Sequence, residues 1–159
     1  MRKYEFTGET RKIQLMFRTV TLHRIRAVIS FGLVDAGELG GWIEKEENLS
    51  HEGKAWVCGD AEVWGNAEVC GDAKVFSASH VLVIGPIGSR NDFTTFYRDR
   101  DNEITVKCGC FLGKIDKFLE KVTRTHGNSK YALVYRAAVE VAKLQIDLSD
   151  EAPEEDGEE

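Results

Sequence analysis

The chain has 159 residues, 42% of them hydrophobic and 30% charged, and a formal net charge of -6. This length fits one domain with a hydrophobic core, and the composition excludes a wholly disordered or fibrous protein. No apolar run reaches the roughly 20 residues of a membrane helix, and the N-terminus lacks the apolar core of a secretory signal. Four cysteines without such a signal indicate a reducing compartment, so we expect a cytoplasmic protein.

Residues 1–52 begin with strands. Apolar residues alternate with polar ones at Ile13, Leu15 and Phe17, and again at Ile25, Ala27, Ile29 and Phe31. Period two is typical of strands, so we predict an N-terminal β-hairpin, and the poorly alternating stretch 22–24 suggests a bulge. The basic residues here are expected on a solvated face. The glycine-rich stretch up to Ser50 is interpreted as a connector that covers the end of the following repeat.

Residues 53–88 repeat every six positions. Written in sixes they read GKAWVC, GDAEVW, GNAEVC, GDAKVF, SASHVL and VIGPIG. Valine or isoleucine takes the fifth position throughout, and glycine and alanine take the first and third positions of the first four units. We expect the branched residues to point inward, alanine to lie where the backbone bends, and glycine to form corners.

This pattern resembles the left-handed β-helix of hexapeptide-repeat proteins, the superfamily that includes the trimeric acyltransferases. There, three hexapeptides form one triangular coil, so the resemblance implies two coils between Gly53 and Gly88. Aromatic and apolar residues flank the inward positions, and we expect an outward apolar strip of Trp56, Trp64, Phe76 and Leu82. It would be covered either by the N-terminal hairpin or by a second subunit of a homo-oligomer.

Residues 89–149 predict an α+β cap on the end of the repeat. Two strands, Phe93–Arg98 and Glu103–Cys108, flank a polar turn. One helix is predicted from Ile115 to a stop at Gly127, and a second from Lys130 to about Gln145. The expected fold class is mainly β with this α+β cap, in a single domain over 1–149. Residues 150–159 carry seven acidic side chains and no basic one, and we expect a disordered acidic tail there.

Over its whole length the chain is similar to a group of small proteins encoded in bacterial prophages, which has no settled activity. The similar stretches are residues 37–50, the GDAEV repeats, residues 88–90 and residues 108–111. The resemblance implies a phage origin, and so a location in the cytoplasm of a bacterial host cell. Together with the glycine-rich region from Gly85 to Arg98, it motivates the concrete hypothesis of an anti-defence protein that sequesters a host defence signal.

The hexapeptide acyltransferases use a histidine as general base at a subunit cleft, where it activates a hydroxyl or amine for attack on a thioester. His80 is the one histidine in the repeat, and its place before Val81 predicts an outward side chain. His80 is therefore the alternative catalytic residue. The repeat lacks the long excursion loop of those enzymes, and two coils offer little surface on which coenzyme A could bind. No metal or cofactor is expected, since Cys108 and Cys110 lack the spacing of a zinc knuckle.

The glycine-rich bend after the repeat gives the binding hypothesis. Exposed backbone amides, a hydroxyl and a guanidinium can together hold an anion, and the adjoining strand and helix junction add donors. The predicted ligand site consists of Ser89, Arg90, Asn91, Thr94, Arg98, His126 and Tyr131. We thus favour a noncatalytic binding protein of phage origin that holds a small anion, such as a nucleotide, or antagonises a host protein. An acyl-coenzyme A-dependent transferase and a structural or assembly protein are the alternatives; membranes and nucleic acids are not expected partners.

Overall fold

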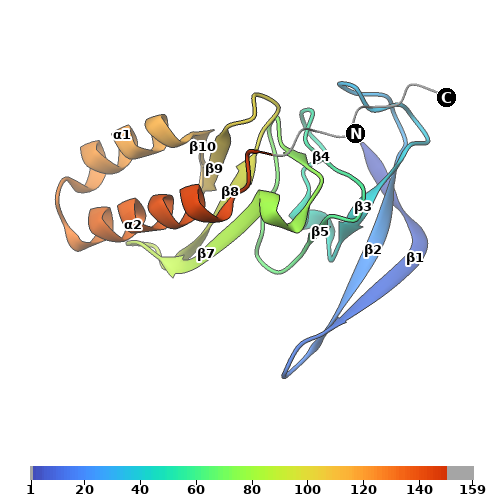
Figure 1. Ribbon diagram of the computed structural model, residues 1–159, viewed down its shortest axis with the longest axis horizontal. Helices are drawn as coiled ribbons and strands as arrows, with labels where there is room; N and C mark the ends of the chain where they lie inside the picture. The colour runs from blue at the N-terminus through green and yellow to red at the C-terminus, as the bar shows by residue number, and fades with distance from the viewer. Residues whose placement is uncertain (1, 150–159) are drawn as a thin grey trace.

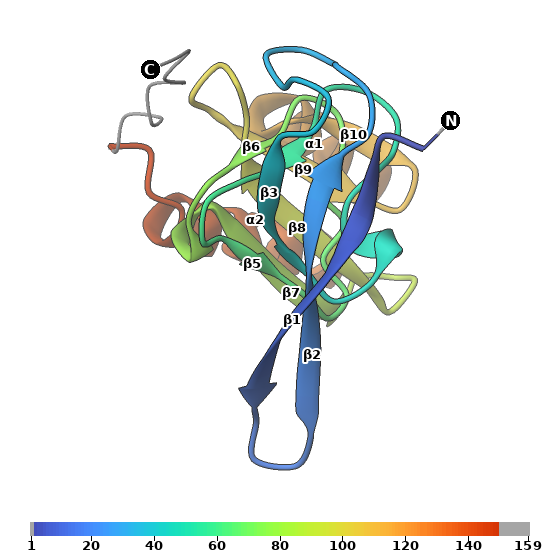
Figure 2. The same cartoon turned by 90° about the vertical axis from the view of Figure 1, so that its right-hand side faces the viewer.

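The computed structural model describes residues 2–149 and places two stacked turns of chain between an N-terminal hairpin and a C-terminal sheet with two helices (Figures 1 and 2). The elements are β1 (Tyr4–Gln14), β2 (Thr19–Ala27), β3 (Leu39–Ile43), the 3-10 helix η1 (Glu46–Asn48), β4 (Trp56–Val57), β5 (Glu62–Val63), β6 (Lys74–Val75), the 3-10 helix η2 (Ala78–His80), β7 (Val81–Ile87), β8 (Asp92–Arg98), β9 (Ile104–Cys108), β10 (Phe111–Lys114), α1 (Ile115–His126) and α2 (Lys130–Gln145). The coarse prediction of a mainly β chain with two helices is confirmed. The predicted acidic tail lies outside the described residues.

The N-terminal hairpin is confirmed as the antiparallel pair β1–β2. Its register shifts between Phe6 and Thr10, so the bulge lies in β1 rather than at 22–24, and the β2–β3 pairing is irregular between Arg24 and Arg26. Both strands lie earlier in the chain than the predicted alternating runs, because Leu15 and Phe17 fall in the connecting turn, and Ile29 and Phe31 lie beyond the end of β2. The distal half of the hairpin projects from the body as an arm (Figure 2).

Parallel backbone pairing joins the two stacked turns, which we call the coil. β3 pairs with β5, Leu49 pairs with Val69, and β4 pairs with β6. Backbone bonds continue this ladder, as where Ser50 N and Cys58 N donate to the carbonyls of Val69 and Val75, both at 2.9 Å. The predicted connector is therefore wrong in role, because its residues 42–50 form part of the first turn. A left-handed β-helix geometry for this coil stays a prediction.

The inward side chains of the coil are those that the repeat predicts. Val57, Val63, Val69 and Val75 are at most 2% exposed, and the four repeat alanines are buried beside them. Ile43 and Leu49 complete the core in the first turn. Glycine forms the corners, with positive φ angles such as 60° at Gly59 and 64° at Gly71, a backbone conformation that favours glycine over residues with a Cβ atom.

The coil ends at Phe76, although the six-residue spacing continues to Ile87. Residues 78–80 form η2, and Val81–Ile87 form β7, which pairs antiparallel with β8. The prediction of hexapeptide turns over 53–88 is therefore wrong for its last two units. A strand alternates with period two, and six is a multiple of two, so a six-residue spacing of apolar residues fits β7 as well as a coil.

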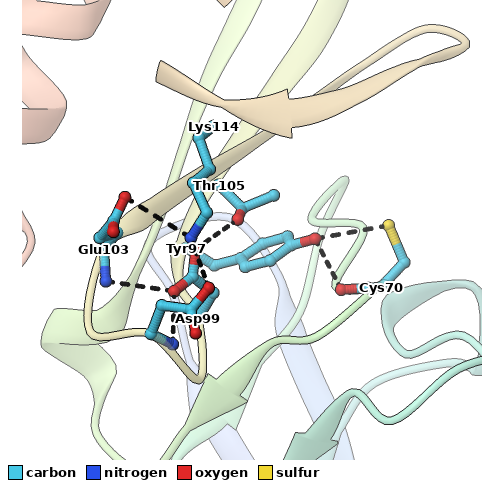
Figure 3. Close-up of polar contacts among 7 residues, drawn as sticks. Cys70, Tyr97, Asp99, Glu103, Thr105 and Lys114 are labelled. Carbon is cyan, nitrogen blue, oxygen red and sulfur yellow. Dashed lines mark hydrogen bonds and ion pairs between the residues drawn. The ribbon is translucent and has the colours of Figure 1, made fainter. Parts of the chain in front are cut away.

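The hairpin and the two helices predicted for the C-terminal cap are confirmed as β8–β9, α1 and α2, with both helices within a residue of their predicted bounds. Strand β7, which was predicted as part of the repeat, and the unpredicted β10 complete one antiparallel sheet with this hairpin. Strand β8 covers the open end of the coil, and every second side chain of this strand faces the coil. The Tyr97 hydroxyl donates to the Cys70 carbonyl at 2.6 Å (Figure 3), and Glu68 N donates to Thr95 Oγ1 at 3.0 Å. Phe96 points to the other side, into a second core with α1 and α2.

Lys3 departs from the expected solvated face, because it is 1% exposed. Its ammonium donates to the Ala55 carbonyl at 2.7 Å and lies 4.7 Å from the centre of the Phe31 ring. Burial, and then the charge of Arg100, lower the pKa of Lys3 to about 8. Other basic residues of the hairpin do lie at the surface, where Arg11 pairs with Glu62 at 2.9 Å.

The contribution of Lys3 to the free energy of unfolding should therefore rise with pH between about 8 and 10. Unfolded Lys3 titrates near 10.5 and folded Lys3 near 8, so the unfolded chain binds more protons in this window and a higher pH favours folding. Summed over this window, the gain is about 2 kcal/mol. Cys70, Tyr4, Tyr97 and Tyr135 have raised pKa values, so they oppose this gain, Cys70 above about pH 9 and the tyrosines near pH 10 and above.

Urea unfolding at a series of pH values measures this slope. The Lys3→Met variant keeps most of the buried chain without the titrating group. Between pH 8 and 10 its free energy of unfolding should therefore change by about 2 kcal/mol less in the stabilising direction than that of the natural protein. A slope equal to that of the natural protein would contradict the assignment to Lys3.

Candidate functional site

A cleft of about 180 Å³ opens in the C-terminal cap. Its lining comes from the β7–β8 turn, the β9–β10 turn and both helices: Ser89, Arg90, Asp92, Cys108, Gly109, Cys110, Phe111, Phe118, Lys121, Val122, Thr125, His126 and Tyr135. Three of the predicted ligand residues, Ser89, Arg90 and His126, are among them. The fold thus brings together residues that lie up to 46 positions apart, from position 89 to position 135.

Tyr135 forms the inner wall of the cleft. Its ring packs edge-on against Phe118 and is stacked with the His126 ring, at centroid distances of 5.6 and 5.8 Å. Burial, and then the neighbouring Cys108, raise the pKa of Tyr135 to about 12, so its hydroxyl stays protonated at neutral pH. Cys108 in turn accepts a hydrogen bond from Thr94 Oγ1 at 3.3 Å.

Gly88 makes room for this tyrosine. Its φ is 80°, and a Cβ atom at this position would overlap the Tyr135 hydroxyl. The turn that follows is closed by Asn91 N, which donates to the Gly88 carbonyl at 3.2 Å, and it presents Ser89 and Arg90 at the mouth of the cleft. A tight turn on a glycine therefore sets where the Arg90 guanidinium lies relative to the ring.

The charges at the cleft are predominantly positive. Arg90 and Lys121 are exposed cations, and Asp92 is the one carboxylate among the lining residues. The Lys121 ammonium lies 5.5 Å from the centre of the Phe111 ring, so a cation and an aromatic face stand side by side. Such a surface suits an anion that also carries a flat or apolar part.

Arg98 does not belong to the cleft, contrary to the prediction. It is 5% exposed, donates to the Asp147 carbonyl at 3.3 Å and lies over the Phe76 ring. Thr94 is also buried, because it faces the helices from within β8. Asn91 and Tyr131 are exposed but do not line the cleft.

His80 is fully buried, so the prediction of an outward side chain is wrong. The chain leaves the coil at Ser77, and η2 turns the imidazole inward. Its Nδ1 accepts a hydrogen bond from Phe76 N at 3.3 Å, and its Nε2 lies 3.2 Å from the Arg98 guanidinium. The ring therefore has structural partners and no access to a substrate from solvent.

The predicted apolar strip is mostly covered by the chain itself. Trp56 is buried, with its ring edge-on to Tyr4 of β1 at a centroid distance of 6.5 Å, as in the hairpin-covered alternative, and edge-on to Phe31 at 5.3 Å. Phe76 lies beneath Arg98. Trp64 and Leu82 stay half-buried, and a role for them at an interface stays a prediction.

Sequence reasoning missed Lys121 and Tyr135. Lys121 follows the polar pattern of α1, and Tyr135 follows the apolar pattern of α2, so neither residue stands out before the two helices are docked. Among residues 2–149, no group of three histidine, cysteine or acidic side chains could hold a metal ion. Within the same residues, no helix is long and apolar enough to cross a membrane.

Comparison with known proteins gives one weak similarity. The chain is 38% identical over 61 residues to the uncharacterized acetyltransferase YdcK of Escherichia coli (strain K12). The matched part is 36% of this chain and 19% of that protein, so the chain spans about a fifth of the length of this relative. No family model matches the chain.

Replacing Gly88 with alanine should destabilise the protein more than the same change at Gly37. Both glycines have positive φ, 80° and 92°, so both variants carry a backbone penalty of about 1–2 kcal/mol. At Gly88 the new Cβ also meets the Tyr135 ring, whereas nothing lies within 4 Å at Gly37. Urea unfolding of the two variants measures the difference, and equal stabilities would show that Tyr135 does not lie against this turn.

Proposed function

We propose that the protein is a noncatalytic binding protein that holds a small phosphate-bearing anion in the cleft. The observation that carries this proposal is the convergence of Arg90 and Lys121, from a turn and a helix, on a cleft with aromatic walls. Arginine binds phosphate oxygens through two parallel N–H groups, and lysine adds a second point charge. The hydroxyls of Ser89 and Tyr135 supply neutral donors beside them.

The size of the cleft limits the ligand. Its volume of about 180 Å³ is below the roughly 300 Å³ at which ordinary small-molecule sites begin. It therefore suits a phosphate with a single ring, such as part of a mononucleotide, better than a large cofactor. Phe111 and His126 line the cleft and supply aromatic surface for such a ring.

Binding without turnover fits the chemistry of the residues. Tyr135 is a proton donor of raised pKa and so a poor general base at neutral pH. With the resemblance to prophage proteins, this favours a phage protein that sequesters a nucleotide signal in the cytoplasm of a bacterial host. Antagonism of a host protein is the variant of this role that needs no small ligand.

An acyl-coenzyme A-dependent transferase is the second candidate, favoured by the hexapeptide pattern and by the similarity to YdcK. The buried state of His80 speaks against it, because the family's base must reach a substrate. A purely structural role is the third candidate and predicts no ligand.

A thermal-shift screen against inorganic phosphate, mono-, di- and cyclic nucleotides, and acetyl-coenzyme A tests these candidates. A ligand at 100 times its dissociation constant adds about 2.7 kcal/mol, which raises the melting temperature by several degrees. We expect a nucleotide to give this rise. A rise with acetyl-coenzyme A alone would favour the transferase. An unchanged melting temperature with every compound would favour a structural role or a protein partner.

Calorimetric titration of the nucleotide hit should then show affinity losses of roughly 10- to 150-fold in Arg90→Ala and in Lys121→Ala, because each removes a charged hydrogen bond worth about 1.5–3 kcal/mol. Arg124→Ala is the matched control, since Arg124 is an exposed cation of α1 that does not line the cleft. Equal affinity in all three variants would remove the cleft as the binding site.

A further inference from the structure

The cleft contains one carboxylate among its cations, and one oxygen of this carboxylate is open to a ligand. Asp92 begins β8, pairs with Ile87 at the foot of the β7–β8 turn, is exposed and lines the cleft. Its Oδ1 accepts a hydrogen bond from the amide of the next residue, Phe93, at 2.7 Å. Among residues 2–149, no hydrogen bond or ion pair reaches its second oxygen, Oδ2.

The two cations of the cleft lie towards the β9–β10 turn and do not neutralise Asp92. Arg90 Nη1 lies 3.7 Å from the position that a Cβ atom would take on Gly109, and the Lys121 ammonium lies 5.5 Å from the centre of the Phe111 ring. Within the part of the chain that the structure describes, neither Arg90 nor Lys121 forms an ion pair. A phosphate held by these cations therefore leaves Asp92 to the adjoining part of the ligand.

The position of Asp92 beside the inner wall of the cleft agrees with this division. Besides burial and Cys108, the charge of Asp92 also raises the pKa of Tyr135, so the carboxylate lies near this phenol. A carboxylate repels a bound anion and so weakens an anion site, unless it bonds to another group of the same ligand. Carboxylates accept hydrogen bonds from hydroxyl groups, and acidic side chains bind ribose hydroxyls in this way in dinucleotide-binding folds.

The volume of the cleft decides which part of a nucleotide it can hold. A cleft of about 180 Å³ suits a phosphate with a single ring. In a nucleotide the ring joined directly to the phosphate is the ribose, and the base follows only beyond it. A ligand bound by its phosphate therefore places its ribose, which carries two neighbouring hydroxyl groups, inside the cleft and its base towards the mouth.

We propose that the cleft selects ribonucleotides, with the phosphate bound by Arg90 and Lys121 and the ribose hydroxyls donating to Asp92. This inference rests on the proposed function, because it concerns the same cleft, and it names the class of ligand. Asp92 is then the residue that sets specificity, since it distinguishes ribose from deoxyribose and from simple phosphates. The base lies outside the cleft and contributes little to the discrimination.

Calorimetric titration of the full chain with AMP, GMP, CMP and UMP, each beside its 2′-deoxy counterpart, tests the inference in a buffer that contains EDTA. The natural protein should bind each ribonucleotide roughly 10-fold or more tightly than the deoxy form. The reason is that the missing hydroxyl removes a hydrogen bond to a charged group. The four bases should differ from one another less than ribose differs from deoxyribose.

Asp92→Asn separates ligand recognition from a structural role. Asparagine keeps an acceptor for Phe93 N and places an amide nitrogen, which is a donor, where Oδ2 was. The preference for ribonucleotides should fall to about 3-fold or less. The affinity for inorganic phosphate should instead rise by about 1.5- to 5-fold, because a like charge is removed. Damage to the fold would lower both affinities together.

Two further variants serve as controls. Asp116→Asn removes an exposed carboxylate of α1 that does not line the cleft, so it should change neither affinity. Arg90→Ala should weaken ribonucleotides and deoxyribonucleotides by the same factor, because it removes a contact to the phosphate that both share. The ratio of the two affinities should therefore stay as in the natural protein.

Several outcomes would overturn the inference and leave the anion site in place. They are equal binding of the ribose and deoxyribose forms, a preference that survives Asp92→Asn, and binding of inorganic phosphate without any mononucleotide. A preference that appears only when Mg²⁺ replaces EDTA would also overturn it, because it would place a metal ion between Asp92 and the phosphate. If neither phosphate nor any nucleotide binds, the inference fails together with the proposed function.

Discussion

The second turn of the coil ends against strand β8, and the phenol of Tyr97 makes that junction by donating to the carbonyl of Cys70 (Figure 3). A coil of two turns cannot end in water without exposing valine side chains and backbone groups, so its end needs a cover. Thr95, two residues earlier on the same face of β8, accepts the amide of Glu68. Because side chains alternate along a strand, Phe96 then points away from the coil and needs a second apolar layer, which α1 and α2 supply.

The cleft is a consequence of this arrangement. Strands β7 and β8 are long enough to extend past the coil, and their connecting turn reaches the helix pair. Gly88 lets that turn approach the Tyr135 hydroxyl, which places Arg90 beside the ends of two helices. The cleft therefore depends on the docking of the helices against β8 and on one glycine, whereas the repeat contributes no residue to it.

The sequence predicts those parts of the fold in which the apolar residues follow a single regular spacing. The second turn of the coil follows its valines and glycines, and α2 follows its apolar face. The first turn escaped prediction because its inward residues, Ile43, Leu49 and Val57, are spaced by six and then by eight positions. Of the site residues, Ser89 and Arg90 could be predicted from the sequence, because they belong to the glycine-rich bend. The burial of Arg98 and His80 could not be predicted from the sequence, because it depends on the point at which η2 leaves the coil.

The sheet of the N-terminal hairpin and the two helices lie on opposite sides of the coil (Figure 1). The arm continues the sheet of the first turn, and the cleft belongs to the sheet that covers the second turn. Any influence of one on the other must pass through the packed valines of the coil, and close-packed interiors move little without a second stable arrangement. The cleft is lined by residues of one chain, which differs from the subunit-boundary sites that the hexapeptide acyltransferase resemblance implies.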